Sequence, residues 1–148
     1  MSLLKKQLTI KPSNLDGAGN GLFTTEFIPK GSLIIEYKGR ISAWKDVNHD
    51  NGNNGYIYYV NRNYVIDASK HPNELARYAN DARGLTKVPG LNNNAEYAEE
   101  GKKVYIRAKK NIQPGEEIFV AYGKEYWQTV RENIRIDKRE RAAKKASK

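Results

Sequence analysis

The sequence predicts a mainly β domain with a few short helices, and two observations carry this expectation. Short runs rich in Ile, Val, Tyr and Phe are separated by Gly, Pro, Asn and Asp, which is the pattern of strands joined by turns. Apolar residues at helical spacing are clear only near the C-terminal end. With 148 residues, the chain can bury one modest hydrophobic core, so we expect one domain with at most a small appendage.

The expected strands are short and follow one another along most of the chain. They cover residues 8–10, 21–24, 33–37, 55–61, 64–67, 104–108 and 117–122. Arg62 and Asn63 lie between two of these runs and predict a tight hairpin. Loops are expected at residues 48–55 and 84–94, and the second is long enough to suggest a functional role.

Helical signals are few. One or two turns are expected over residues 72–78 and one more over residues 42–48. The C-terminal stretch gives the clearest signal, because Trp127, Val130 and Ile134 are spaced i, i+3 and i+7 among polar residues. This helix is expected to dock its apolar stripe on the domain and then to fray into a basic tail.

The formal net charge of +9 is unevenly distributed along the chain. Residues 138–148 contain six basic side chains and one glutamate, a net charge of +5, so +4 remains for all other residues. Such a tail is typically solvated and gives at most weak, salt-sensitive contact with nucleic acid or an acidic partner. The rest of the chain does not have the charge of a nucleic-acid-binding domain.

Several classes of protein are not expected from this composition. No apolar run reaches the length of a membrane span, and the first residues lack the apolar stretch of a secretion signal. Because the chain has no cysteine, it has no disulfide framework, thiolate metal site or cysteine nucleophile. We therefore expect a soluble cytoplasmic or nuclear protein without a membrane contact.

A glycine cluster, Gly17-Ala18-Gly19-Asn20-Gly21, lies near the start of the chain. Glycine accepts positive φ and has no Cβ, so such a cluster often lets a ligand approach the backbone. A dinucleotide-binding loop is excluded, because it must open a helix, whereas β-branched and aromatic residues and a Pro/Gly turn follow here. The cluster therefore leads into a strand, and a plain hairpin turn is the alternative to a ligand-binding loop.

Motifs of one known family occur in order along the chain. They are Gly19-Asn20-Gly21 with Leu22-Phe23; Glu36-Tyr37-Lys38-Gly39; Ile66-Asp67-Ala68 followed by Asn73 and Ala76-Arg77-Tyr78-Ala79-Asn80; and Gly115-Glu116-Glu117-Ile118 through Ala121-Tyr122-Gly123. In this order and spacing they resemble the SET-domain family of protein lysine methyltransferases, over residues 14–127. The resemblance implies a SET-domain (β-clip) fold of small sheets with a knot-like threaded segment and a C-terminal helix. It implies a SET domain over residues 1–127 and a C-terminal helix with a basic tail over residues 128–148.

The resemblance also implies an activity and a set of site residues. The activity is that of an S-adenosylmethionine-dependent protein-lysine N-methyltransferase, which methylates a lysine ε-amine of a protein substrate such as a histone tail. The implied catalytic residues are Tyr122, Tyr37 and Tyr97. The implied cofactor-binding residues are Gly19, Asn20, Gly21, Tyr78, Asn80, Asp81, Tyr122 and Trp127. No metal site is expected.

Tyrosines suit the chemistry that the resemblance implies. The sulfonium group is already a strong methyl donor, so the protein must supply alignment, exclusion of water and a neutral amine. A lysine with a pKa of about 10.4 is rarely neutral at pH 7, and an aromatic channel beside a sulfonium lowers that pKa. Tyr97, together with Val120 where other members carry Phe or Tyr, favours monomethylation. The tyrosines expected to be core or strand-face residues are Tyr56, Tyr58, Tyr59 and Tyr105.

By resemblance, Asn80 contacts the amino-acid part of the cofactor and stabilises the threaded segment. We expect a buried amide whose donor and acceptor groups are both satisfied. Arg77 is expected to be a structural tie, while Trp127 either packs on the adenine or joins the core.

The chain departs from the family at a few positions. Asp81 stands where members usually have histidine after the central asparagine, and Arg40 replaces a common glutamate. No zinc-binding cysteines follow Tyr122, so a minimal, zinc-free form would use Tyr126 and Trp127 with the C-terminal helix as its lid. These departures leave open a catalytically weak or inactive SET-like module that binds peptide or protein. A third hypothesis is a nucleic-acid-associated β domain that relies on its basic tail, and the oligomeric state is not predicted.

Overall fold

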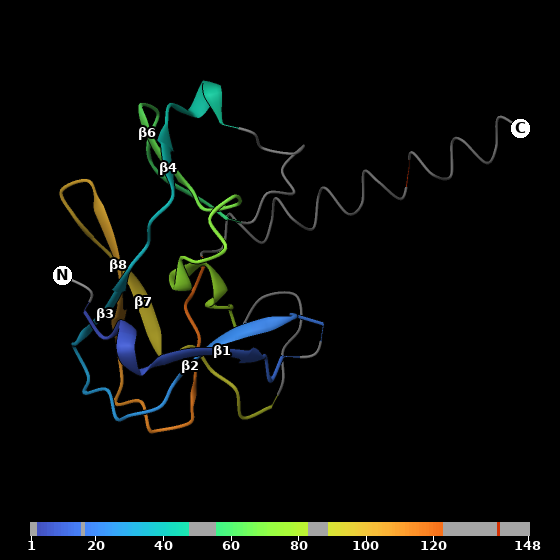
Figure 1. Ribbon diagram of the computed structural model, residues 1–148, viewed down its shortest axis with the longest axis vertical. Coiled ribbons are helices and arrows are strands. Elements are labelled where there is room, and N and C mark those ends of the chain that lie inside the picture. The colour runs from blue at the N-terminus through green and yellow to red at the C-terminus, as the bar shows by residue number, and fades with distance from the viewer. Residues whose placement is uncertain (1–2, 16, 48–55, 83–88, 123–138, 140–148) are drawn as a thin grey trace, which may run out of the picture.

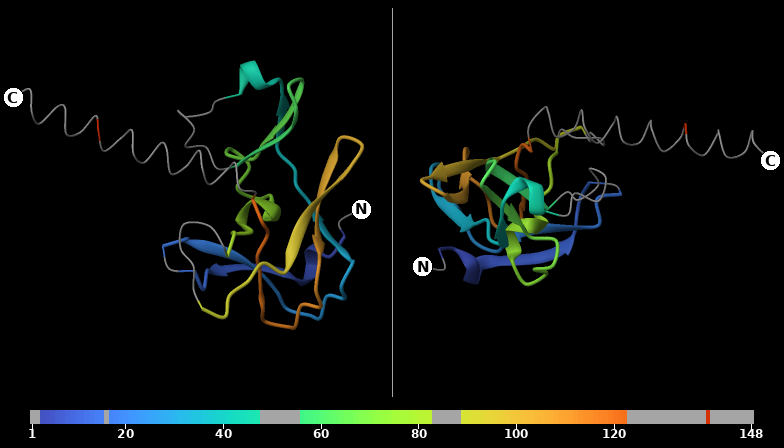
Figure 2. Two further views of the ribbon diagram at one scale, coloured as in Figure 1. Left: turned by 180° about the vertical axis from the view of Figure 1, so that it is seen from behind. Right: turned by 90° about the horizontal axis from the view of Figure 1, so that it is seen from above.

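The strands described by the computed structural model form three small antiparallel sheets (Figure 1). The structure describes residues 3–15, 17–47, 56–82, 89–122 and 139. Within these residues the sheets have the strand orders β1-β2-β9, β3-β8-β7 and β4-β6-β5. Strands β4 and β6 lie at the top of Figure 1, away from β1 and β2, and the left view in Figure 2 shows the same separation. The expected mainly β architecture with short helices is confirmed.

The strands and helices are all short. The strands are β1 (Leu8–Pro12), β2 (Asn20–Thr24), β3 (Leu33–Glu36), β4 (Arg40–Ser42), β5 (Ile57–Asn61), β6 (Tyr64–Asp67), β7 (Ala95–Glu100), β8 (Lys103–Ala108) and β9 (Glu117–Ile118). The 3₁₀ helices are η1 (Lys5–Gln7), η2 (Trp44–Asp46) and η4 (Leu75–Tyr78). In the described part of the chain, no helix is both long enough and apolar enough to cross a membrane.

Most of the strands expected from the sequence are present, and two were missed. The hairpin predicted at Arg62 and Asn63 is confirmed, because β5 and β6 pair antiparallel on either side of it. The short helical turns expected over 42–48 and 72–78 are present as η2 and η4. Strands β4 and β7 and helix η1 were not expected. The predicted C-terminal helix and the tail lie outside the described residues, apart from residue 139.

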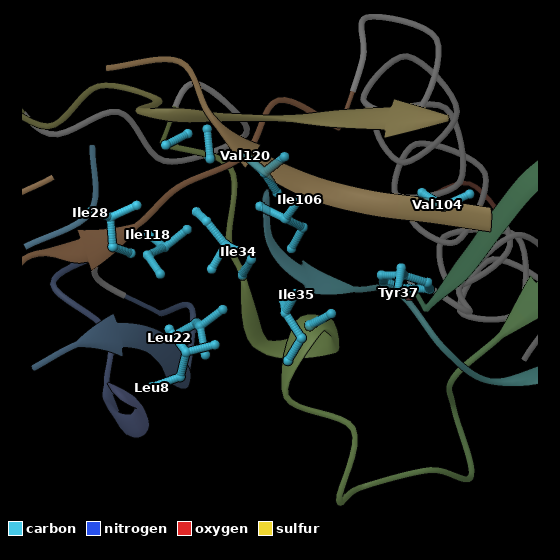
Figure 3. Close-up of a cluster of buried hydrophobic side chains, with 14 of the residues drawn as sticks. Leu8, Leu22, Ile28, Ile34, Ile35, Tyr37, Val104, Ile106, Ile118 and Val120 are labelled. Atoms are coloured by element: carbon cyan, nitrogen blue, oxygen red, sulfur yellow. The ribbon is translucent and has the colours of Figure 1, made fainter. Parts of the chain in front are cut away.

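Side chains from all three sheets contribute to one hydrophobic core (Figure 3), with Ile66 coming from sheet β4-β6-β5. Leu22 and Ile118 come from sheet β1-β2-β9, and Ile34 and Ile106 come from sheet β3-β8-β7. These four side chains are fully buried, with 0% relative exposure. The alternation of buried and more exposed residues along β8 is the period of a strand with one face on a core. The two sheets are therefore fixed to each other by burial of apolar surface.

The segment that continues β9 lies between two other parts of the chain. The amide of Val120 donates a hydrogen bond to the carbonyl of Asn80 over 2.8 Å. On the other side, the amides of Asn94 and Ala95 donate to the carbonyl of Phe119 over 3.1 and 3.0 Å. Parallel bridges join Asn80 to Phe119 and Ala95 to Val120. This three-segment arrangement brings sequence motifs that are far apart into one place.

Candidate functional site

Five of the polar and aromatic residues near this arrangement form a connected group, which we call the polar junction: Asn20, Asn80, Asp81, Asn93 and Tyr122. The side-chain amide of Asn80 donates to the main-chain carbonyl of Asn20 over 3.0 Å. One Asp81 carboxylate oxygen accepts from the Tyr122 main-chain amide over 3.0 Å, and the other accepts from Asn93 Nδ2 over 2.9 Å. The structure thus brings together predicted residues from the first, third and fourth motifs.

Asn80 differs from the expectation in its burial. It is half-buried, where the sequence predicted a buried amide. Its carboxamide donates to Asn20, and its main-chain carbonyl accepts from Val120. Asn80 therefore retains some exposure to solvent. The amide connects the glycine cluster to the β9 segment rather than filling the core.

The glycine cluster closes the hairpin between β1 and β2, in which Pro12 faces Asn20. Gly19 has φ of 71°, in the left-handed region that favours glycine, and its carbonyl accepts from the Ser13 amide over 2.8 Å. The plain hairpin interpretation is therefore correct for the backbone. Gly19 and Asn20 are both exposed residues, and the Asn20 carbonyl is the group that meets the Asn80 side chain.

Glu117 is a buried carboxylate that fastens the glycine cluster, and the sequence did not indicate this role. Its side chain accepts from Ser13 Oγ over 2.6 Å and from the Asn14 amide over 2.8 Å. Its relative exposure is 3%. A Cβ built on Gly21 would lie 2.2 Å from Glu117 Oε2, so only glycine fits beside this carboxylate. Glu117 of the fourth motif is thereby bonded to the residues that precede the glycine cluster and packed against Gly21 of the first motif.

Three tyrosine rings form a second group, the aromatic cluster: Tyr37, Tyr58 and Tyr97. The ring centroids of Tyr58 and Tyr97 are 5.0 Å apart, and those of Tyr37 and Tyr97 are 6.1 Å apart, both edge to face. The rings of Tyr37 and Tyr58 lie 6.2 Å apart and are tilted. These separations are in the range of favourable aromatic pairs. The structure therefore places two of the predicted catalytic tyrosines, Tyr37 and Tyr97, in direct ring contact, with Tyr58 packed against both.

Tyr58 was expected to be a core or strand-face residue, and it lies on β5 and packs against the hydrophobic core; it is also the third member of the aromatic cluster. Its hydroxyl donates to Glu99 Oε1 over 2.9 Å. Burial raises the pKa of Tyr58 well above its ordinary value, and the hydrogen bond and negative charge of Glu99 raise it further. Strand alternation was the available signal, because Tyr58 points to the cluster whereas its neighbour Tyr59 is 52% exposed.

The hydroxyl groups of three of the predicted tyrosines, Tyr37, Tyr78 and Tyr122, donate to backbone carbonyls. The Tyr122 hydroxyl donates to the carbonyl of Ala79, and the hydroxyl of the buried Tyr37 donates to the carbonyl of Tyr56 over 2.7 Å. The Tyr78 hydroxyl donates to the Pro72 carbonyl over 2.7 Å. Trp127 and Tyr126, the expected lid residues, lie outside the described residues.

Arg77 is a structural tie, as the sequence suggested. Its Nη1 donates to the carbonyls of Ala68 and Ser69 over 2.8 and 3.1 Å. Its guanidinium also lies over the Tyr56 ring, 4.0 Å from the centroid. Arg77 thus fixes η4, which precedes Asn80, to the end of β6.

Strand β7 and the β9 segment connect the polar junction with the aromatic cluster. Ala95 bridges Val120 of the β9 segment, and Tyr97 lies two residues further on the same face of β7. Tyr37, Tyr97 and Tyr122 all belong to or pack against the same hydrophobic core. Among the described residues, no group of three or more His, Cys, Asp or Glu side chains is arranged to hold a metal ion.

Comparisons with known proteins give a consistent family. A family model described as SET domain matches residues 19–123. The chain is 28% identical over 123 residues to N-lysine methyltransferase KMT5A-A of Danio rerio, covering 74% of this chain and 33% of that protein. It is 27% identical over 131 residues to the protein of the same name from Xenopus laevis, covering 80% and 37%. The chain therefore spans about a third of the length of these curated relatives.

Among solved structures, the methyltransferase domain of human PR domain-containing protein 2 is similar, with a TM-score of 0.59 and 28% sequence identity. The similarity covers 82% of each chain. The fold expected from the motifs is confirmed by this likeness. Because the family model matches well over half of the sequence, the chain belongs to the SET domain family.

Proposed function

We propose that this chain is a protein-lysine N-methyltransferase that uses S-adenosylmethionine and acts on a lysine of a protein substrate. The family and the names of the relatives support this activity. The observation that carries it is that Asn80 and Asp81 are hydrogen-bonded to the β9 segment that bears Tyr122, while the Asn80 side chain also donates to Asn20. Residues from three separate motifs converge there, as a site built from those motifs requires.

The polar junction has donors and acceptors that fit the amino-acid part of the cofactor. Gly19 and Asn20 are exposed residues, and the Asn20 carbonyl accepts from the half-buried carboxamide of Asn80. Carbonyl oxygens suit an ammonium group and amide groups suit a carboxylate, so uncharged groups of both kinds match a zwitterion. When bound, S-adenosylmethionine supplies an activated methyl group on a sulfonium. Gly21, Tyr78, Asp81 and Trp127 complete the proposed cofactor site through backbone or ring surface.

We propose that the tyrosines bind and orient the substrate lysine. The rings of the aromatic cluster exclude water and disfavour a charged amine, which keeps the substrate lysine in its neutral form. Tyr37 and Tyr97 line the lysine site, and the Tyr122 hydroxyl orients the amine toward the methyl group. The Ala79 carbonyl fixes the direction of that hydroxyl.

The number of methyl groups and the substrate are parts of the same proposal. Tyr97, half-buried and packed on Tyr58, leaves little space around the amine, and Val120 supplies no second hydroxyl. Both features favour monomethylation. A histone tail or another lysine-bearing protein is the proposed partner, and the basic tail gives at most weak contact with nucleic acid.

Incubation with labelled S-adenosylmethionine and candidate proteins, followed by mass spectrometry of the products, tests the proposal. The wild-type chain should transfer one methyl group to lysine. Tyr122→Phe should lower the transfer rate about 100-fold, because a misaligned amine reacts that much more slowly. Tyr105→Phe, in a half-buried tyrosine of β8 outside both groups, is the matched control. Calorimetry without detectable cofactor binding would support the peptide-binding module and end the enzyme hypothesis.

A further inference from the structure

Asp81 makes contacts that its family-typical counterpart, histidine, cannot make in the same way. The carboxylate is buried, with 7% relative exposure, and its oxygens accept from two donors on different segments. One donor is the Tyr122 main-chain amide and the other is the Asn93 side chain. A carboxylate accepts at both oxygens and carries no donor when ionised, which is what two converging N–H groups require.

Asn93 is itself fixed and completes the arrangement. Its side chain is buried, with 8% exposure, and its Oδ1 accepts from the Ala82 amide over 2.8 Å. Its Nδ2 donates to Asp81. Because the Ala82 amide can only donate, it determines which end of the Asn93 amide faces Asp81. The Ala82 main-chain amide therefore sets the orientation of the Asn93 side chain, and Asn93 in turn fixes the Asp81 carboxylate by a hydrogen bond.

We propose that Asp81 and Asn93 are positioning residues for Tyr122. The Asp81 carboxylate holds the Tyr122 main chain, and Asn93 holds the carboxylate, so the tyrosine is fixed at its amide as well as at its hydroxyl. The catalytic consequence rests on the proposed methyltransferase function. At the position where family members usually have histidine, the buried Asp81 side chain therefore helps to hold the Tyr122 main chain in place.

The pattern of donors and acceptors makes a specific prediction for exchanged side chains. In Asp81→Asn, an NH₂ group must face either the Tyr122 amide or Asn93 Nδ2, so one donor always meets another donor. In Asn93→Asp, two carboxylates face each other and repel. In the double variant Asp81→Asn/Asn93→Asp, all three hydrogen bonds can form again. The new carboxamide at position 81 would accept from the Tyr122 amide and donate to the new carboxylate at position 93. That carboxylate would accept from the Ala82 amide as well.

Amide hydrogen exchange of the full chain, followed by NMR without cofactor, tests the structural part. In Asp81→Asn the Tyr122 amide should exchange about tenfold faster, which corresponds to the loss of one buried hydrogen bond. The Val120 amide, which donates to Asn80 in the same segment, serves as the internal control. The double variant should return the Tyr122 rate to within about twofold of wild type. Asp46→Asn, an exposed aspartate of η2, is the control for removal of a charge.

Methyl transfer tests the catalytic part. Asp81→Asn should lower kcat about tenfold with a smaller change in KM, and the double variant should restore kcat. Unchanged exchange at Tyr122 in Asp81→Asn, or a double variant no better than the worse single variant, would overturn the proposal.

If exchange follows the prediction but wild type methylates no protein, the proposed function fails and the structural role of the pair is retained. If Asp81→Asn does not fold, the double variant decides, because restored folding together with restored exchange supports the pairing and an unfolded double variant contradicts it.

Discussion

The polar junction and the aromatic cluster differ in how their residues are held together. In the polar junction, hydrogen bonds join residues that are 60, 41 and 12 positions apart in the sequence. In the aromatic cluster, Tyr58, Tyr97 and the buried Tyr37 meet mainly through ring surfaces. Hydrogen bonds are directional and specify which atom faces which, whereas ring contacts depend on shape and burial.

This difference predicts two kinds of sensitivity. In the polar junction, a change that keeps the shape of a side chain but exchanges an oxygen for an NH₂ group should be harmful, because it leaves a donor facing a donor. In the aromatic cluster, a change that keeps the ring should be tolerated far better. The first region suits the orientation of a ligand, and the second suits the exclusion of water from an amine. Both regions depend on a neighbouring glycine, which gives the largest effects.

Gly39→Ala should destabilise the protein most, by about 3 kcal/mol. A Cβ at this position would lie 2.5 Å from the Asp67 carbonyl oxygen and 2.8 Å from the Ala68 amide nitrogen. These are backbone atoms at the end of β6, which pairs with the Tyr58-bearing strand β5. The clash can therefore be relieved only by movement of the main chain. The free energy of unfolding in urea measures the effect. Gly101→Ala, with open space but φ of 64°, is the control and should cost about 1 kcal/mol. Equal losses in the two variants would contradict the backbone clash.

Gly21→Ala should cost somewhat less, about 2 kcal/mol, because the obstacle is a side chain. The new Cβ would lie 2.2 Å from Glu117 Oε2, and the carboxylate can shift only by losing its bonds to Ser13 and Asn14. A double-mutant cycle with Glu117→Ala, measured by urea unfolding, isolates this contact. The second substitution should cost less in the Gly21→Ala background than in wild type. Strictly additive losses would show that the carboxylate is not the obstacle.

Most strands of the fold could be predicted from the local sequence pattern. A strand was missed where its local pattern is weak and its pairing with another strand makes it form. Strand β6 has the predicted bounds because Tyr64, Val65 and Ile66 are strong strand formers next to a turn. Strand β7 was missed because Glu96, Glu99 and Glu100 mask its apolar signal. It forms because Ala95 and Ala98 are buried where β7 pairs with β8. Tertiary pairing there overrides weak local propensity.

The candidate site was predictable only where motifs carried it. Asn20, Asn80 and Tyr122 were predicted through the family pattern, and the structure bonds Asn80 to Asn20 and the neighbouring Asp81 to Tyr122. Nothing in the sequence near Glu117 indicates a bond to Ser13, which is 104 positions away. Asn93 likewise has a role only because the fold places it beside Asp81. Buried polar pairs of this kind depend on long-range geometry, which no local pattern encodes.

Tyr37→Phe should reveal the smaller sensitivity of the aromatic cluster. The ring and its contacts with Tyr58 and Tyr97 are kept, while the hydrogen bond to the Tyr56 carbonyl is lost. We expect a loss of about 1 kcal/mol in the free energy of unfolding, the usual value for one hydrogen bond. Tyr59→Phe, on a 52% exposed ring, is the matched control and should change stability by less than about 0.5 kcal/mol. A loss from Tyr37→Phe as large as that from Gly21→Ala would show that the cluster depends on direction as strongly as the polar junction does.

The smallest effect should come from Glu99→Gln, which changes the ionisation of Tyr58 without disturbing the rings. Burial is the first cause of the raised pKa of Tyr58 and remains, while the charge of Glu99 is removed, so the pKa should fall but stay above 10. Because the folded-state pKa is raised, the stabilising contribution of neutral Tyr58 is complete below pH 10 and declines only as the pH rises above it. Absorbance titration, with Tyr58→Phe subtracted to isolate this residue, measures the shift. Glu100→Gln, on the exposed neighbouring position, should leave the titration unchanged. If both variants titrate as wild type does, Glu99 does not affect the ionisation of Tyr58, and burial alone raises the pKa of that residue.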